Sequence, residues 1–222
     1  MNKIELIIDA IERAKNHQSK MDDVAWSVPA LSSLKIRHLM NNLGAISTRY
    51  WECGVHKGGL FCSTIRNNPN IIIAGANDSF ESDENSEDKA LPQFESNVMK
   101  CKSPDTTFVL RIGDTFELDP ITGPTGIDLY LFDADHSYES QRKAMTHFLP
   151  AMADEFIVCV DDYDWRDVEF GTQDGIRRDL EKRDQGGVGA LVEVLFEERF
   201  VGNDHDNDGY WNGFYIALLK KK

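Results

Sequence analysis

Hydrophobic residues along the chain follow two alternating patterns. Short, nearly continuous apolar runs predict strands, and they occupy residues 46–53, 71–76, 107–112, 127–132 and 156–160. Apolar residues at helical spacing predict helices over residues 60–66, 93–102, 138–152 and 172–183. Strands that alternate with helices form parallel sheets covered by helices on both faces, so the pattern predicts an α/β protein.

Two helical patterns precede the first predicted strand. They cover residues 4–14 and 31–43, and the second ends at Gly44, a common residue at helix C-termini. We interpret residues 1–45 as an N-terminal helical cap or lid, and residues 46–222 as the main domain.

The C-terminal end of the chain predicts a different kind of strand pair. Residues 191–196 and 213–219 are two further apolar runs, with a polar turn and no helix between them. Strands joined without a helix pair antiparallel, so we expect a hairpin at the sheet edge. The complete prediction is a seven-stranded, mostly parallel sheet with an antiparallel C-terminal hairpin.

Charge restricts the class of partner. The 222-residue chain has 24 Lys and Arg against 38 Asp and Glu, a formal net charge of −14. Such a chain is repelled by phosphate backbones and by anionic membrane surfaces. We therefore expect a small-molecule partner, with neither nucleic acid nor membrane. The cap helices of two copies could pair, so a homodimer remains an alternative to a monomer.

Cysteine usage and the apolar runs indicate a compartment. The four cysteines, Cys53, Cys62, Cys101 and Cys159, form no Cys-x-x-Cys pair, which argues against structural zinc and a disulfide framework. The N-terminus has no apolar targeting segment, and no run approaches the ~20 residues that span a bilayer. A cytoplasmic location is the expectation.

Acidic residues follow most of the predicted parallel strands. Ligands of open α/β sheets bind beyond the carboxyl ends of the strands, so these side chains converge on one rim. Like charges gathered there cost free energy unless a cation or a polar ligand offsets them. The residues that follow the five strands in turn are Glu52 with Gly54 and Gly58, Asn77 with Asp78, Asp114, Asp133 with Asp135 and His136, and Asp161 with Asp162.

The spaced set resembles a known family. Glu52-x-Gly54-x-x-x-Gly58, then Asp133-x-Asp135-His136-Ser137-Tyr138-Glu139, then Asp161-Asp162-Tyr163, is similar to the class I S-adenosylmethionine-dependent methyltransferases. The nearest branch is the small O-methyltransferases related to macrocin and catechol-type enzymes. The resemblance implies a Rossmann-like fold and transfer of a methyl group to a small hydroxylated acceptor, such as a sugar or a phenol.

The resemblance also implies how the cofactor is held. Glu52, Gly54 and Gly58 would form the loop under the methionine part of S-adenosylmethionine. The acid at the second strand end would hold the ribose, and Asp114 would lie by the adenine.

One position departs from the family pattern. The usual ribose-binding acid falls at Asn77, which lacks the charge, and Asp78 is one residue later. Asp78 takes that place if the strand ends one residue late.

For the chemistry, the metal-dependent branch implies Mg²⁺ bound by Asp133, Asp161 and Asp162, where it would orient the acceptor hydroxyl and lower its pKa. Asp133 and His136 are the candidate catalytic residues, with His136 as general base because imidazole titrates near neutral pH. Many enzymes of this fold keep such acids without any metal, so a metal-free site stays open. The residues after the fifth strand, among them Tyr163 and Trp165, are candidates for the acceptor pocket.

Two other functions remain open. A strand that ends in Asp-x-Asp also marks metal-dependent glycosyltransferases, in which Asp133 and Asp135 would hold a nucleotide-sugar. That reading leaves the loop from Glu52 to Gly58 unexplained. The third alternative is a non-catalytic binding protein with the methyltransferase fold, and Asn77 is its best support.

Two acidic segments have simpler interpretations. Residues 78–88 predict a solvated loop near the site. Residues 204–209 match the first half of an EF-hand loop, but Tyr215 stands where the bidentate Glu is required, so a polar hairpin turn is expected.

Overall fold

The computed structural model describes residues 1–81, 89–181, 190–202 and 209–222. In this part of the chain, seven strands form one sheet in the order β3-β2-β1-β4-β5-β7-β6. The strands are β1 (Arg49–Cys53), β2 (Ile73–Asp78), β3 (Thr107–Ile112), β4 (Ile127–Phe132), β5 (Met152–Asp161), β6 (Val192–Phe200) and β7 (Phe214–Lys221).

Strands β1 to β5 are mutually parallel, and β7 pairs antiparallel with both β5 and β6. The predicted α/β architecture with a C-terminal antiparallel hairpin is therefore confirmed. The second strand of the hairpin lies next to β5, which leaves β6 at the sheet edge.

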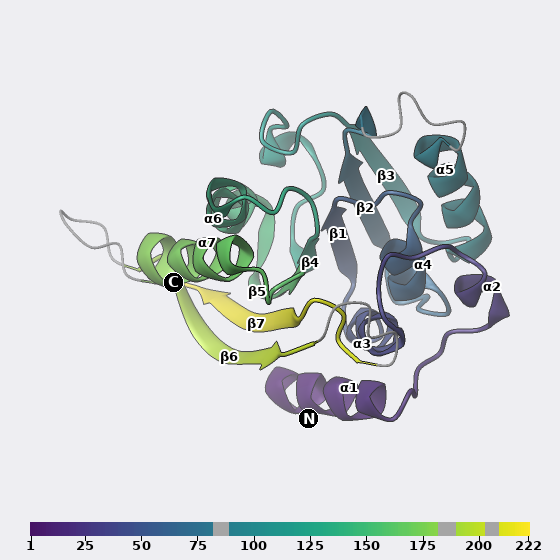
Figure 1. Ribbon diagram of the computed structural model, residues 1–222, viewed down its shortest axis with the longest axis horizontal. Coiled ribbons are helices and arrows are strands. Elements are labelled where there is room, and N and C mark those ends of the chain that lie inside the picture. Colours follow the sequence, from purple (N-terminus) through teal and green to yellow (C-terminus); the bar gives the residue numbers. More distant parts are fainter. Residues whose placement is uncertain (82–88, 182–189, 203–208) are drawn as a thin grey trace.

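Helices cover both faces of the sheet, with α6 and α7 on one side and α3, α4 and α5 on the other (Figure 1). Side chains of a strand alternate between these faces, so Tyr50 belongs to one buried cluster and Trp51 to the other. The helices are α1 (Lys3–Lys15), α2 (Asp23–Trp26), α3 (Leu34–Gly44), α4 (Gly59–Ile65), α5 (Ala90–Cys101), α6 (Tyr138–His147) and α7 (Arg166–Asp174), with short turns η2 (Pro120–Thr122) and η3 (Leu149–Ala151) and a π-helical turn η4 (Gly175–Glu181).

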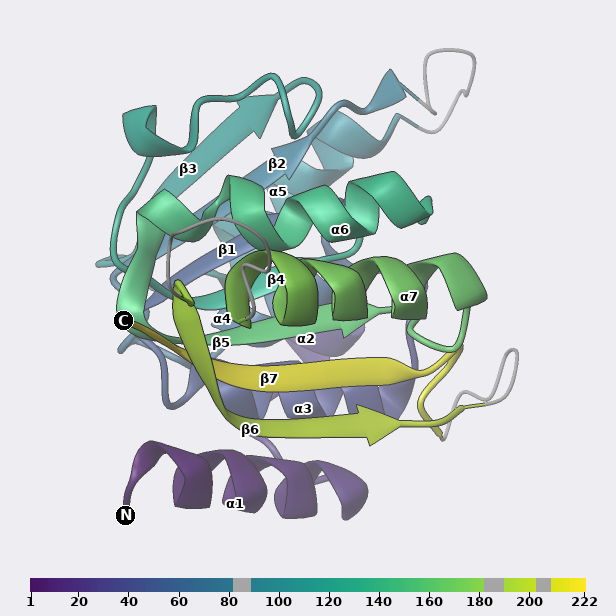
Figure 2. The same ribbon diagram turned by 90° about the vertical axis from the view of Figure 1, so that its left-hand side faces the viewer.

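The N-terminal helices belong to one of the helix layers. Helix α1 lies along the β6 edge of the sheet (Figures 1 and 2). Its buried residues Ile7 and Ile11 share a cluster with Ile216 of β7. Asn2 caps α1 and Ser33 caps α3, because each side chain accepts a backbone N–H of the first turn. The cap at Ser33 explains why α3 starts later than residue 31.

Several predicted elements were wrong at their ends, including the three described next. The predicted helix over residues 138–152 stops at His147, and Pro150, which has no N–H to continue a helix, lies in η3 before β5 begins. The helix predicted from residue 172 begins earlier, at Arg166. Strand β2 continues to Asp78, two residues beyond its predicted end.

Some predictions fall on segments that the structure does not describe. Residues 82–88 of the acidic segment, residues 203–208 of the EF-hand-like segment and the end of the helix predicted to residue 183 lie outside the described residues. Within the described part, no helix is long and apolar enough to cross a membrane.

Candidate active site

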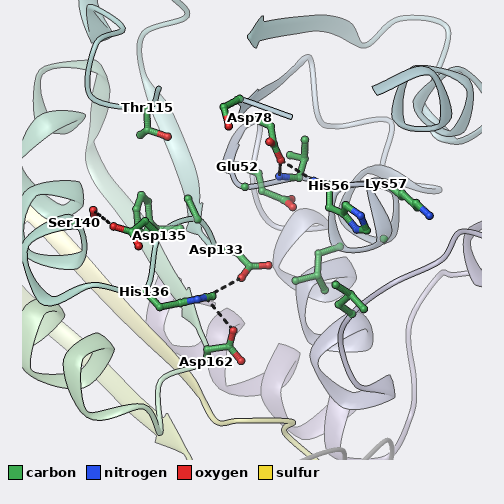
Figure 3. A pocket seen from close by; sticks show the side chains of 18 of the residues that line it. Glu52, His56, Lys57, Asp78, Thr115, Asp133, Asp135, His136, Ser140 and Asp162 are labelled. Carbon is green, nitrogen blue, oxygen red and sulfur yellow. Dashed lines mark hydrogen bonds and ion pairs between the residues drawn. The ribbon is translucent and has the colours of Figure 1, made fainter. Parts of the chain in front are cut away.

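A cavity of about 590 Å³ opens at the carboxyl ends of the parallel strands. Its size suits a small ligand. Figure 3 shows its side chains facing one another from the ends of β1, β2, β4 and β5. Eight of the residues singled out in the sequence line it: Glu52, Gly54, Asp78, Asp114, Asp133, Asp135, His136 and Asp162.

The loop after β1 needs its glycines for backbone geometry. Gly54 has φ +84°, and a Cβ there would lie 1.9 Å from the carbonyl oxygen of Asp133. Gly58 has φ +86°, and a Cβ there would lie 2.7 Å from Phe94. Both residues therefore keep the loop close to its neighbours, and of the two only Gly54 lines the cavity.

Glu52 is the buried carboxyl group of the cavity floor, with 1% of its surface exposed. The Tyr50 hydroxyl, two residues earlier on the same face of β1, donates a hydrogen bond to it. Burial raises the pKa of Glu52 well above its usual range, and the Tyr50 hydrogen bond counteracts part of that shift. Glu52 lines the cavity, and a cationic group placed beside it would favour the charged form of its carboxyl group.

The end of β2 separates the roles of Asn77 and Asp78. The Asn77 side chain is fully buried; it donates to the carbonyl oxygens of Arg111 and Gly113 and accepts from Thr115. Asn77 thus fastens β2 to the loop after β3 and does not line the cavity.

Asp78 is the residue of this pair that faces the cavity. Its Oδ2 accepts the backbone N–H groups of Val55 and His56, both at 2.8 Å, and its Oδ1 accepts that of Phe80 at 2.7 Å. Counting only partners among the described residues, Oδ1 accepts this one hydrogen bond, and a carboxylate oxygen can accept a second from a ligand hydroxyl.

The loop after β3 supplies the rim of the cavity. Asp114 is exposed, and its carboxylate accepts the backbone N–H of Phe116 at 2.6 Å. Phe116 also lines the cavity, as does the segment Pro29–Ser32 between α2 and α3. Sequence reasoning missed both, because neither carries a charge or a motif.

Two carboxylates and an imidazole meet where β4 and β5 end. Nε2 of His136 lies 3.0 Å from Oδ2 of Asp162 and 4.0 Å from Oδ1 of Asp133 (Figure 3). One ligand atom from each residue lies within 4.8 Å of the other two. The left-handed backbone of Asp162, with φ +53°, and a 2.7 Å hydrogen bond from Asn212 to its Oδ1 hold this carboxylate in place.

The charges of this cluster shift the pKa values of its members. Burial, together with the nearby charge of Asp162, raises the pKa of Asp133 to about 6. The carboxylates of Asp133 and Asp162 raise the pKa of His136 to about 10. A general base must be neutral, so the two carboxylates disfavour the general-base role predicted for His136.

Asp161, the third predicted metal ligand, is not among the three residues whose ligand atoms lie within 4.8 Å of one another. Its carboxylate is buried, accepts the backbone N–H of Asp162 at 3.0 Å and does not line the cavity. Burial raises its pKa well above the usual range. The structure therefore brings together Asp133 and Asp162 with His136 in the third place.

Three other residues lie near the cluster and contact neighbouring side chains. The Asp135 carboxylate accepts hydrogen bonds from the hydroxyls of Ser137 and Ser140, and it points away from Asp133 (Figure 3). Tyr163 is buried and stacks on Tyr215. Trp165 remains 46% exposed and meets the His136 ring edge-on at 4.8 Å.

Comparisons with known proteins identify the family and the fold. A sequence model described as a methyltransferase domain matches residues 51–163, half of the chain. No curated protein matches the sequence.

Solved structures share the fold. An O-methyltransferase from Bacillus cereus, in complex with S-adenosylhomocysteine, superposes with a TM-score of 0.60 at 14% identity, over 99% of this chain and 93% of that one. TomG from Streptomyces achromogenes, an O-methyltransferase of tomaymycin synthesis in complex with S-adenosylmethionine, gives 0.60 at 16% identity, over 95% and 89%. Since the sequence match spans half of the chain and the fold agrees over nearly all of it, the chain belongs to the methyltransferase domain family and has the class I, S-adenosylmethionine-dependent methyltransferase fold.

Proposed function

We propose that the protein transfers the methyl group of S-adenosylmethionine to a hydroxyl oxygen of a small acceptor, such as a sugar or a phenol. One observation carries the proposal. A single cavity joins the predicted cofactor residues Glu52, Asp78 and Asp114 to the cluster of Asp133, His136 and Asp162. Cofactor and acceptor can thus occupy one enclosed space, with their reacting atoms close together.

The cofactor-binding half of the cavity follows the order of the strands. Glu52 accepts a hydrogen bond from the amino group of the methionine part. Gly54 has no side chain, so the loop after β1 can lie close to the cofactor. Asp78 takes the ribose-binding role, because it faces the cavity and Asn77 does not. Asp114 and Phe116 on the rim border the adenine.

The acceptor-binding half lies at the ends of β4 and β5. The acceptor hydroxyl approaches Asp133, and the exposed Trp165 beside His136 offers a flat apolar surface for a ring. The hydroxyl proton passes to the Asp133 carboxylate. The acceptor oxygen then forms its bond to the methyl carbon, while the carbon–sulfur electron pair returns to sulfur and yields S-adenosylhomocysteine.

A divalent cation is part of the proposal, and Mg²⁺ is the ion that the family resemblance implies. When bound, such an ion lowers the pKa of the acceptor hydroxyl. The solvent-shielded Nε2 of His136 and the two carboxylates that face it are a donor set that fits a divalent cation.

The proposal also covers the N-terminal cap, the class of acceptor and the location of the protein. Residues 1–45 act as the cap, since Pro29–Ser32 line the cavity. The net charge of −14 supports a small molecule over nucleic acid as the acceptor. A cytoplasmic location and a homodimer stay as predictions from the sequence.

The glycosyltransferase alternative finds little support, because the Asp135 carboxylate is engaged by Ser137 and Ser140 and points away from Asp133. Two experiments distinguish the non-catalytic alternative from a methyltransferase. Calorimetric titration with S-adenosylhomocysteine in EDTA tests the cofactor site, and we expect micromolar binding. Formation of S-adenosylhomocysteine from S-adenosylmethionine, with a panel of phenols and sugars and added Mg²⁺ or Mn²⁺, tests turnover. Binding without any turnover would favour a binding protein, and absence of binding would refute the methyltransferase proposal.

A further inference from the structure

We propose that Asp133, His136 and Asp162 form a three-ligand site that binds a first-row transition-metal dication in preference to Mg²⁺. This inference rests on the proposed function, since it identifies the cation of the same site. It replaces the ligand set of three aspartates with two carboxylates and one imidazole nitrogen.

The spacing of the three ligand atoms supports a shared ion. Around an ion with bonds of about 2.1 Å, ligand atoms at right angles lie about 3 Å apart, and opposite ones about 4.2 Å apart. The separations of Nε2 of His136 from the oxygens of Asp162 and Asp133 are 3.0 and 4.0 Å. All three atoms come from the strand-end side of the cavity, which leaves the remaining coordination positions open toward the acceptor (Figure 3).

A second observation concerns the nitrogen itself. Nε2 of His136 is shielded from solvent, and its nearest charged neighbours are the two carboxylates, with Oδ2 of Asp162 at 3.0 Å and Oδ1 of Asp133 at 4.0 Å. A dication between these three atoms would take the place of the proton that the nitrogen otherwise shares with the carboxylates, because metal binding to histidine releases a proton. The Trp165 ring, edge-on to the imidazole at 4.8 Å, limits its rotation and keeps Nε2 aimed between the carboxylates.

The carboxylates are also positioned for one-oxygen ligation. Asn212 donates to Oδ1 of Asp162 at 2.7 Å, so Oδ2 is the oxygen left to face His136. Outer hydrogen bonds of this kind orient metal ligands and are typical of built metal sites. Asp161, in contrast, directs an oxygen to the backbone N–H of Asp162.

The donor set decides which ion is preferred. Mg²⁺ favours an all-oxygen shell and keeps several waters, whereas an imidazole nitrogen suits the transition metals. Affinity of a nitrogen–oxygen site rises from Mn²⁺ through Co²⁺ and Ni²⁺. Replacing the third carboxylate by His136 therefore favours these ions and changes the role of His136 from general base to ligand.

The test is metal binding to the full-length protein after dialysis against EDTA and removal of the chelator. Titration with Mn²⁺, followed by loss of the electron paramagnetic resonance signal of the free ion, gives the affinity, and competition gives that of Mg²⁺. We expect Mn²⁺ to bind at least about tenfold tighter than Mg²⁺. We also expect Co²⁺ to give visible absorption bands that respond to loss of the nitrogen ligand.

Three variants locate the ligands. His136→Gln should lower the Mn²⁺ affinity about 10- to 100-fold while it changes that of Mg²⁺ much less, and should alter the Co²⁺ spectrum. Asp162→Asn should weaken both ions. Asp105→Asn, the same change at an exposed position that does not line the cavity, is the matched control and should bind like the wild type.

Equal affinities for Mn²⁺ and Mg²⁺, a His136→Gln variant that keeps the Mn²⁺ preference, or no binding of either ion would each overturn the site. Thermal unfolding of every variant separates loss of ligand from loss of fold. Binding of S-adenosylhomocysteine in EDTA keeps the two proposals apart, because the cofactor site can succeed while the metal site fails.

Discussion

The carboxylate of Asp78 holds the backbone of His56: Oδ2 accepts the His56 N–H at 2.8 Å and, at the same distance, that of Val55. The end of β2 thus fixes the loop after β1. Asp78 therefore shapes the cavity and also faces it, so under the proposed function it would contribute both to stability and to cofactor binding.

Asp78→Asn should therefore weaken both. The amide can present its oxygen or its NH₂ group to the two N–H donors, and it carries no charge. We expect a loss of about 1–3 kcal/mol in the free energy of unfolding, since hydrogen bonds to charged groups contribute that much. The affinity for S-adenosylhomocysteine should fall at least about tenfold, a loss of about 1.4 kcal/mol. Urea unfolding and calorimetric titration measure the two effects. Asp105→Asn, at an exposed position, is the control and should change neither.

Asn77→Asp should destabilise the fold. The NH₂ group of Asn77 donates to the carbonyl oxygens of Arg111 and Gly113, at 3.2 and 3.0 Å. An aspartate would place a buried negative charge beside both oxygens. We expect a loss of about 2–4 kcal/mol in the free energy of unfolding, or a raised pKa of the new carboxyl group. Urea unfolding at pH 8 and pH 5 measures both, because protonation should recover part of the loss at the lower pH.

Asn2→Asp is the matched control for that substitution. Asn2 caps α1 from an exposed position, where Asn and Asp are nearly equivalent. An Asn77→Asp variant as stable as Asn2→Asp, with tighter cofactor binding, would show instead that residue 77 reaches the ribose.

Tyr50→Phe should impair Glu52. The Tyr50 hydroxyl is fully buried and donates to the Glu52 carboxyl, so its removal leaves a buried acid without that donor. The expected loss is about 1–3 kcal/mol in the free energy of unfolding, together with weaker binding of S-adenosylhomocysteine. Tyr130→Phe is the matched control, since Tyr130 is equally buried but its hydroxyl contacts only the Cys53 sulfur, at 3.9 Å. Equal losses in both variants would contradict a special role for the Tyr50–Glu52 pair.

The strand ends show how much of the site can be predicted from the sequence. Apolar runs with acidic ends were sufficient to predict the parallel sheet, the hairpin and the rim on which Glu52, Asp114 and Asp133 lie. Which of two adjacent residues faces the cavity depends on where a strand ends and how its backbone turns. Asp78 faces the cavity because β2 pairs with β3 as far as Asp78 opposite Ile112.

The same limit applies to the residues after β4 and β5. Asp162 turns its side chain toward His136 because its φ is +53°, a backbone choice that no sequence pattern indicates. The ring of Phe116 reaches the cavity through loop geometry alone. Motif spacing therefore predicts the region of the site, while local backbone geometry selects the individual side chains.

His38 should make the stability of the protein depend on pH. It is buried on α3, its Nδ1 lies 2.7 Å from the Ser19 hydroxyl, and Trp26 and His17 pack around its ring. Burial lowers its pKa to about 4 from the ordinary value of 6.5, with smaller contributions from the charges of His17 and Arg37. The folded protein thus excludes a proton that the unfolded chain binds.

The sign of the effect follows from this difference. The His38 contribution is fully present above pH 6.5 and is lost as the pH falls toward 4, because the unfolded state binds the proton first. The full loss is about 3 kcal/mol in the free energy of unfolding. His38→Gln, which can keep a hydrogen bond to Ser19, should have the smaller dependence on pH in this window. Urea unfolding of both proteins at half-unit steps from pH 7.5 to 4 measures the difference between the two curves, in which other titrating groups cancel. A difference that stays constant across the window would show that His38 titrates alike in the folded and unfolded states.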